Sequence, residues 1–205
     1  MKILMLLPRL PLPLNRGDRI RSFHELTYLA RRHQLWCACL IDEPPQPHHL
    51  AAVAQHCQGL ASLAVARPVR AARSLIAVAT GRTFTQAYFA CPTLHKTVAR
   101  WARTVRFDAV LAFSSAMAEL AEALPARRRV LDLVDVDSQK WANYARMAGW
   151  PASALYAREA RQLLQRELAW LQRFDATVVV CSREAALLSA ASAATRLHVV
   201  PNGAD

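Results

Sequence analysis

The stretch KILMLLPRLPLPLNRGDRIRSF (Lys2–Phe23) decides the fold class of this chain. Its first six residues, Lys2–Leu7, are apolar at nearly every position, which is typical of a central strand of a parallel sheet. A proline-rich loop over Pro8–Asn15 follows and leads to Gly17. Beyond it, apolar residues recur at helical spacing. The order of strand, loop and helix predicts the first half of a βαβ unit.

Apolar runs and amphipathic segments alternate along the rest of the 205 residues. This alternation predicts an α/β, Rossmann-like open parallel sheet with helices on both faces, formed by residues 1–205 as one domain. The expected strands are Lys2–Leu7, Gln34–Ile41, Leu60–Ala66, Asp108–Phe113, Arg129–Val134, Phe174–Cys181 and Leu197–Val200. The expected helices are Arg19–Arg32, Leu50–Cys57, Val69–Thr80, Pro92–Arg103, Met117–Ala123, Trp141–Met147, Ser153–Arg173 and Arg183–Ala190. The segment Gly81–Phe89 is expected to be a loop.

The composition is that of a globular protein, with 54% hydrophobic and 20% charged residues. No apolar stretch has the length and purity of a membrane span, and the apolar run at the start of the chain ends at Pro8 and Arg9. We therefore expect a cytoplasmic protein. The five cysteines include no CxxC pair, so thiols in a reducing compartment explain them better than disulfides or a zinc site.

The formal net charge of +11 comes almost entirely from arginine. Such a charge attracts polyanions, which include nucleic acid and anionic membrane surfaces. The arginines are spread over several segments, without a compact basic arm or interleaved aromatic residues, so nucleic acid is the least favoured partner. A solvated basic surface and attraction to an anionic membrane surface both stay open.

Ligands of open parallel sheets bind at the carboxyl ends of the strands. The loop after the first strand lacks GxGxxG, so a dinucleotide cradle is not expected. It places Gly17 before a helix, where backbone N–H groups can contact an anion or a hydroxyl without a Cβ in the way. Arg16, Gly17, Asp18 and, further along the helix, His24 are predicted to bind substrate. The alternatives are an ordinary helix entry for Gly17 and a capping role for Asp18.

The segment LDLVDVDSQKW (Leu131–Trp141) concentrates three aspartates at the end of an expected strand. Carboxylates this close repel one another, which predicts a raised pKa for at least one of them and suits a general base. We predict Asp135 as the catalytic or acceptor-binding residue, and Asp137 and Ser138 as substrate-binding residues. A helix cap is the alternative for the last two. A metal site is disfavoured because no histidine lies nearby, so no metal is expected.

Two further positions complete the predicted site. Ser114 follows the strand FDAVLAF and is predicted to bind a hydroxyl or a phosphate, with capping of the next helix as the alternative. The closing residues VVPNGAD (Val199–Asp205) place Asn202 and Gly203 in a turn pair that tolerates positive φ. We interpret residues 199–205 as a hinge to a further domain; a frayed terminus is the alternative.

Four features together resemble the amino-terminal domain of a GT-B glycosyltransferase of family 4, in particular the sugar transferases of exopolysaccharide and PEP-CTERM/exosortase gene clusters. The first two are the P-x-x-P loop with Gly17-Asp18-x-x-Arg21, and the D-x-V-D-x-D-S-x-K-W segment. The others are E-x(7)-D-A-T-V-V-V-C-S from Glu167 to Ser182 and the closing V-V-P-N-G-A-D. The resemblance covers essentially the whole chain.

The resemblance implies transfer of a sugar from a nucleotide-sugar donor to a polysaccharide or lipid-linked acceptor, with retention. It implies that this chain shapes the acceptor side, that a missing carboxyl-terminal domain binds most of the donor, and that the chain alone is inactive. No cofactor and no catalytic metal are expected. Many family members carry a histidine where Asp135 stands here, which makes Asp135 a candidate replacement.

The resemblance also implies peripheral association with the inner face of the plasma membrane. A non-catalytic binding module for an anionic ligand or a membrane surface is the alternative function. A Rossmann oxidoreductase is disfavoured by the missing glycine-rich motif.

Overall fold

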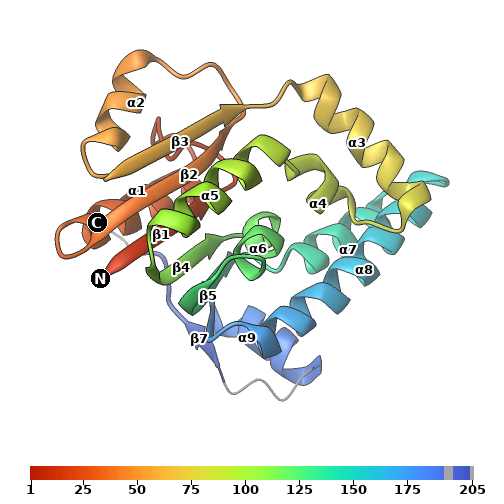
Figure 1. Ribbon diagram of the computed structural model, residues 1–205. Helices are drawn as coiled ribbons and strands as arrows, with labels where there is room; N and C mark the ends of the chain where they lie inside the picture. The colour runs from red at the N-terminus through yellow and green to blue at the C-terminus, as the bar shows by residue number, and fades with distance from the viewer. Residues whose placement is uncertain (192–195, 204–205) are drawn as a thin grey trace.

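A computed structural model describes residues 1–191 and 196–203. They form an α/β domain around one seven-stranded sheet in which every pairing is parallel, in the order β3-β2-β1-β4-β5-β6-β7 (Figure 1). The strands are β1 (Lys2–Leu7), β2 (Gln34–Ile41), β3 (Gly59–Ala64), β4 (Phe107–Phe113), β5 (Ala126–Val134), β6 (Ala176–Val179) and β7 (Leu197–Val199). The predicted fold class is therefore confirmed.

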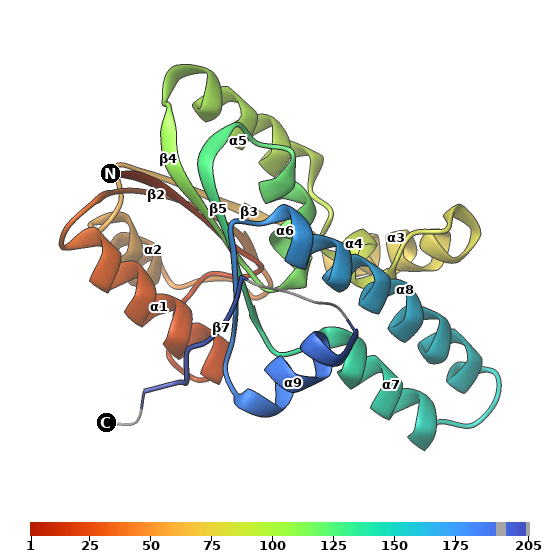
Figure 2. The same ribbon diagram turned by 90° about the horizontal axis from the view of Figure 1, so that it is seen from below.

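Helices cover both faces of the sheet, as Figure 2 shows with the sheet seen from below: α1 and α2 lie on one side, and α5, α6 and α8 on the other. The helices are α1 (Gly17–Ala30), α2 (Pro47–Ala54), α3 (Arg67–Thr80), α4 (Phe84–Phe89), α5 (Pro92–Thr104), α6 (Ser115–Glu122), α7 (Asp137–Met147), α8 (Ala152–Arg173) and α9 (Ser182–Ala191). No helix in the described ranges is both long and apolar enough to cross a bilayer.

The first strand is buried on both faces, as its apolar sequence predicts. Leu4 and Leu6 belong to the core under α5 and α6. Met5 and Leu7 belong to the core on the opposite face, which includes Leu26 of α1. Because its side chains alternate between the faces, a strand in the middle of a doubly covered sheet needs apolar residues at successive positions.

The order of the strands reverses between β1 and β4. From β1 the chain winds through β2 to β3 at one edge, and then returns to place β4 on the other side of β1. The loops that follow β1 and β4 consequently diverge at the carboxyl end of the sheet. This is the topological switch point at which open α/β sheets bind ligands.

The segment Gly81–Phe89, expected to be a loop, contains the helix α4 (Phe84–Phe89), so that prediction was wrong. Thr83 caps the helix by accepting a hydrogen bond from the N–H of Gln86. The Glu159 carboxylate on α8 accepts from the N–H groups of Phe84 (2.6 Å) and Thr85 (3.0 Å). A six-residue helix is marginal by itself. Here a side chain 75 residues away in sequence stabilises it.

The inner side of α1 is more polar than its apolar spacing predicts. Arg19, Arg21, Ser22 and Leu26 are its buried residues, whereas Ile20 is largely exposed. The two arginines are buried because each pairs with an acidic side chain at the carboxyl end of the sheet: Arg19 with Asp42 and Arg21 with Asp132. Paired burial of this kind offsets the cost of removing a guanidinium from water.

Arg21 also holds the chain after β7. Its Nε and Nη2 atoms lie 2.8 and 2.7 Å from Oδ2 of Asp132, and its Nη1 donates to the Val200 carbonyl (3.0 Å) and to Oδ1 of Asn202 (2.9 Å). Asn202 thus uses its side chain as an anchor, and Gly203 keeps φ outside the left-handed region. The rest of the proposed hinge, Ala204 and Asp205, lies outside the described residues.

Candidate functional site

A cavity of about 840 Å³ lies at the carboxyl ends of β1, β4 and β5, over the switch point. The sheet contributes Pro8 and Arg9 after β1, Phe113 and Ser114 at the end of β4, and residues 133–135 at the end of β5. A volume of this size suits a ligand of several rings, since most small-molecule sites measure about 300–1,000 Å³.

Two strained residues lie in the cavity wall. Ser114 has a φ of 66° and Val134 a φ of 63°, and they are the non-glycine positive-φ residues of the described chain. This conformation is costly for a β-branched residue such as Val134. The N–H of Ser114 donates to the Asp132 carbonyl at 2.6 Å, so a bond between the two strand ends helps to hold the strain. Backbone strain of this kind concentrates at functional sites.

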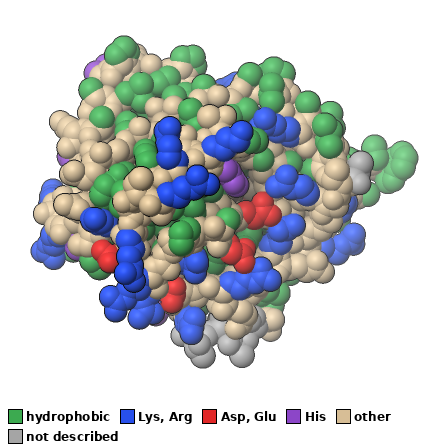
Figure 3. Space-filling view, in the orientation of Figure 1, with side chains coloured by type: hydrophobic (Ala, Val, Ile, Leu, Met, Phe, Trp, Pro, Cys, Tyr) green, Lys and Arg blue, Asp and Glu red, His purple; other side chains and the backbone are tan. Residues whose placement is uncertain are grey.

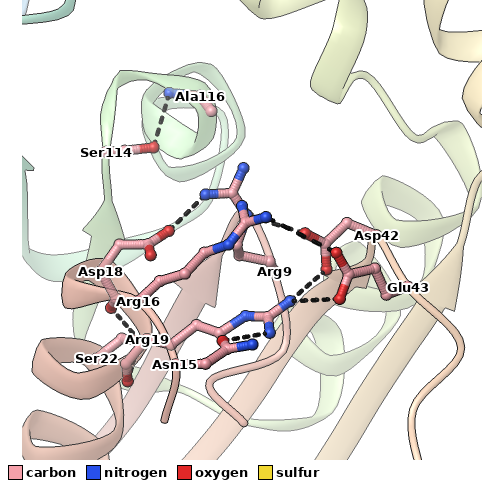
Figure 4. A network of polar contacts seen from close by, with 10 residues as sticks. All are labelled: Arg9, Asn15, Arg16, Asp18, Arg19, Ser22, Asp42, Glu43, Ser114 and Ala116. Atoms are coloured by element: carbon pink, nitrogen blue, oxygen red, sulfur yellow. Dashed lines mark hydrogen bonds and ion pairs between the residues drawn. The ribbon is translucent and has the colours of Figure 1, made fainter. Parts of the chain in front are cut away.

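Charged residues form one wall, with the network drawn in Figure 4. Arg9 pairs with both Asp18 and Asp42. Arg19 donates to Asp42 and to Asn15, each at 2.9 Å, and lies behind the cavity rather than in its lining. Arg16 is half-exposed, with its guanidinium 3.7 Å from the Glu43 carboxylate. Arg16 is therefore the arginine of this loop that is freest to bind an anion.

Aromatic and aliphatic side chains form the opposite wall. They come from four helices: Leu75 and Val78 on α3, Phe84, Tyr88 and Phe89 on α4, Trp141 on α7, and Leu155 and Tyr156 on α8. Phe84 and Trp141 pack edge to face with their ring centroids 6.0 Å apart, and Trp141 and Tyr156 pack in a tilted arrangement with centroids 5.3 Å apart. Such rings bind the apolar faces of sugars or hydrocarbon chains.

The buried residue Arg70 joins this aromatic wall to the sheet. Its guanidinium donates to the carbonyl of Val65 (3.0 Å), just after β3, and to the carbonyl of Ile41 (2.9 Å), the last residue of β2. It also lies over the rings of Tyr88 (5.4 Å) and Phe89 (6.0 Å). These cation–π contacts fix α4 relative to the strands.

The acidic segment places two carboxylates in the cavity at different depths. Asp135 is exposed at the rim, and Asp137 lies deeper, where it accepts a hydrogen bond from the hydroxyl of Ser115. Burial raises the pKa of Asp137; the bond from Ser115 acts against this, and the charge of Asp135 is a smaller cause. A raised pKa was predicted from repulsion, but desolvation is its main cause. The third aspartate, Asp132, forms an ion pair with Arg21.

Ser138 lies behind the cavity wall and belongs to a buried pair. Its N–H donates to Oε1 of Glu167 at 3.1 Å, and its hydroxyl bonds the other oxygen of that carboxyl group. Burial raises the pKa of Glu167 to about 8, although both bonds from Ser138 act in the opposite direction. Ser138 therefore ties the start of α7 to the middle of α8 and positions the aspartates before it.

Six of the eight residues predicted to be catalytic or to bind substrate lie together in the lining of the cavity: Arg16, Gly17, Asp18, Ser114, Asp135 and Asp137. Gly17 opens α1, and a Cβ added there would meet no atom within 4 Å. Ser114 also caps α6 by accepting from the N–H of Ala116. The other two lie elsewhere: His24 is exposed on α1, and Ser138 is buried against Glu167.

Comparison with known proteins gives matches among solved structures. No protein-family model matches the chain, and no curated protein matches it. The N-terminal domain of trehalose-6-phosphate phosphatase from Candida albicans superposes with a TM-score of 0.52 at 12% identity, over 100% of this chain and 49% of that one. The Medicago truncatula protein UGT71G1, solved with UDP-glucose, superposes with a TM-score of 0.54 at 9% identity, over 97% of this chain and 51% of that one. This chain has a GT-B-like fold.

The GT-B-like domain spans about half the length of the structures it matches. At these identities the similarity shows the fold alone, so any inference about chemistry has to come from the residues of the cavity. Within the described ranges, no group of three or more His, Cys, Asp or Glu side chains is placed to hold a metal ion. The residues that line the cavity offer carboxylates, hydroxyls, aromatic rings and three cations, of which Arg16 is half-exposed, Lys140 is exposed and Arg9 is paired with aspartates.

Sequence reasoning missed the aromatic wall and two cations of the GT-B-like domain, Arg9 and Lys140. The wall residues come from four helices far apart along the chain, and their spacing within each helix resembles that of ordinary core residues. One local signal existed: Phe84, Tyr88, Phe89 and Trp141 are four of the chain's few aromatic residues, which make up 7% of the sequence.

Proposed function

We propose that this chain is the acceptor-side half of a glycosyltransferase that moves a sugar from a nucleotide-sugar to a polysaccharide or lipid-linked acceptor, with retention. The cavity over the switch point carries the proposal, because it combines a charged wall with an aromatic wall in a GT-B-like fold. Sugar hydroxyls can bond the charged wall, while ring faces or a hydrocarbon chain can pack on the aromatic one.

Asp135 is the proposed catalytic or acceptor-binding residue. It lies at the rim, on the carboxyl end of β5, where an incoming hydroxyl would first meet a carboxylate. Arg16 and the N-terminus of α1 at Gly17 face the same cavity and can bind negative charge from a phosphate. Ser114 and Asp137 line the same cavity and can orient hydroxyl groups.

A membrane surface is the proposed location of the acceptor. Large apolar side chains are exposed on α3 and at the α7–α8 connection: Leu75 is 75% exposed, Met147 86% and Trp150 86%. Both segments lie on the same side of the molecule in Figure 1 and Figure 2. Leu75 and Leu155 also line the cavity, so the exposed apolar surface is continuous with the aromatic wall. The net charge of +11 would add attraction to anionic headgroups.

Transfer assays with the full-length enzyme, rather than with this proposed half alone, test the proposal. UDP-glucose and GDP-mannose serve as donors, and a polyprenyl-phosphate-linked sugar and a free oligosaccharide serve as acceptors. We expect transfer to at least one acceptor, and a loss of about 10²–10⁴-fold in kcat for Asp135→Asn if the carboxylate acts as a base. Transfer at the wild-type rate by Asp135→Asn would exclude the catalytic role.

Vesicle co-sedimentation tests the membrane location. We expect the chain to bind anionic vesicles more strongly than neutral ones, and Trp150→Ser to weaken that binding. The matched control is Trp101→Phe, which changes a half-buried tryptophan away from this surface. Equal binding to both kinds of vesicle, or no effect of Trp150→Ser on binding, would contradict the proposed membrane location.

A non-catalytic binding module for an anionic ligand is the second candidate. It is favoured by the low number of carboxylates that face the cavity from the described residues, since Asp18 pairs with Arg9 and Asp137 with Ser115. Binding of a nucleotide-sugar or a glycan without transfer to any acceptor would favour this module over the enzyme.

A further inference from the structure

A second cavity, of about 380 Å³, lies between α4, α5 and α6. It touches the main cavity only along Phe89 and Ala116, which line both. Its polar lining residues are Arg82, Gln86, His95, Lys96 and Glu119. None of the residues predicted for the main site belongs to it, so it needs an explanation of its own.

The N-terminus of α5 opens into this second cavity. Pro92 is the first residue of the 13-residue helix, no side chain caps it, and its first turn carries no acidic residue. Unpaired N–H groups and the helix dipole make such an end attractive to an anion. Lys96, one turn along, lines the same cavity and is exposed.

The charges around the second cavity leave it positive. Arg82 and Lys96 are the cations that line it, and Glu119 is the acidic residue among its described lining residues. His95 also lines it, but burial lowers the pKa of this imidazole, so His95 adds no positive charge at neutral pH. The Glu119 carboxylate is already bound by two arginines, with Arg82 at 3.2 Å and Arg166 at 2.9 Å. Figure 3 shows the corresponding face, with Lys and Arg side chains surrounding a small group of Asp, Glu and His. Lys96 therefore keeps its charge available for a ligand.

Gln86 supplies the observation that points to a specific ligand. Gln86 is among the residues that line the second cavity and is 3% exposed, yet neither its amide oxygen nor its amide nitrogen has a hydrogen-bond partner among the described residues. An unpaired buried amide costs about 1–3 kcal/mol. One hydroxyl group can both donate to its oxygen and accept from its nitrogen.

We propose that the second cavity binds a small organic anion that carries a hydroxyl group next to a phosphate or a carboxylate. The anionic group lies at the N-terminus of α5 with Lys96, and the hydroxyl bonds the Gln86 amide. Because Gln86 and Phe89 both belong to α4, the occupant also stiffens the helix that carries the aromatic wall of the main cavity. The second cavity is therefore an effector site. This inference does not depend on which reaction the main cavity serves.

Isothermal titration calorimetry of the chain tests the proposal with three probes: glycerol 3-phosphate, inorganic phosphate and glycerol. We expect glycerol 3-phosphate to bind more tightly than inorganic phosphate, and glycerol not to bind. Lys96→Glu should weaken the binding of glycerol 3-phosphate by about tenfold or more. The matched control, Arg103→Glu, is the same charge reversal at the other end of α5 and should change this affinity by less than about twofold.

Gln86→Met tests the hydroxyl contact, since methionine has nearly the same length and lacks the amide. We expect about five- to tenfold weaker binding of glycerol 3-phosphate and unchanged binding of inorganic phosphate. Three results would overturn the proposal: no heat of binding at millimolar glycerol 3-phosphate, equal effects of Lys96→Glu and Arg103→Glu, or unchanged affinity in Gln86→Met. Circular dichroism melts verify that each variant is folded.

Discussion

Replacement of Glu167 by glutamine should make the protein more stable at alkaline pH. The Glu167 carboxyl is buried and bonded to the N–H and the hydroxyl of Ser138, and burial raises its pKa to about 8 from an ordinary value of 4.5. Between pH 4.5 and pH 8 the folded chain therefore keeps a proton on Glu167 that the unfolded chain has already released. Stability must fall as the pH rises through this window.

The size of the effect follows from the pKa difference. One pKa unit corresponds to about 1.36 kcal/mol, so a rise from 4.5 to about 8 sets an upper limit of about 5 kcal/mol lost above pH 8. Glutamine keeps both contacts, because its oxygen can accept from the Ser138 N–H and its nitrogen can donate to the hydroxyl. We expect Glu167→Gln to match the wild type near pH 5 and to exceed it by up to that amount at pH 8.5.

Urea unfolding followed by tryptophan fluorescence at pH 5, 7 and 8.5 measures this difference. Glu25, whose pKa burial likewise raises to about 8, stays in the variant, so some decline of stability with pH should persist. Glu43→Gln, a change at a partly exposed surface carboxylate, serves as the matched control and should preserve the wild-type slope. A stability gap between Glu167→Gln and the wild type that is the same at all three pH values would refute the reasoning.

Three further predictions concern single contacts. Gly17→Ala should keep or slightly raise the melting temperature, because its Cβ meets no atom within 4 Å, yet it should weaken acceptor binding measured by calorimetry. Gly59→Ala should cost about 1–3 kcal/mol in urea unfolding, because its Cβ would lie 2.8 Å from the Trp36 ring; an unchanged midpoint would contradict this. Glu159→Ala should cost of the order of 3 kcal/mol by leaving two N–H groups of α4 unpaired, and Glu159→Gln clearly less.

Elements stabilised by local sequence could be predicted, and those stabilised from a distance could not. The apolar run Lys2–Leu7 and the proline at the start of α5 are local signals, and both elements begin where expected. The helix α4 depends on Glu159, which no pattern within residues 81–89 can reveal. Its misassignment as a loop hid the aromatic wall, because a loop gives no reason to place Phe84 and Tyr88 on one surface.

The candidate site follows the same division. The strand ends placed Ser114, Asp135 and Asp137 in one cavity, since parallel strands bring their carboxyl ends to one edge. The orientation of side chains on α1 was not predictable from spacing. His24 faces solvent because buried pairs, such as Arg21 with Asp132 across 111 residues, determine which side of the helix turns inward.

Arg21 makes the segment after β7 and the first helix mechanically dependent on each other. Residues 200 and 202 cannot shift without either breaking their two bonds to Arg21 or carrying α1 with them. The first turn of that same helix, at Gly17 and Asp18, lines the main cavity. A displacement of residues 200–202 is therefore transmitted through Arg21 and α1 to the wall of the main cavity. A ligand bound at Gly17 would in turn oppose that displacement.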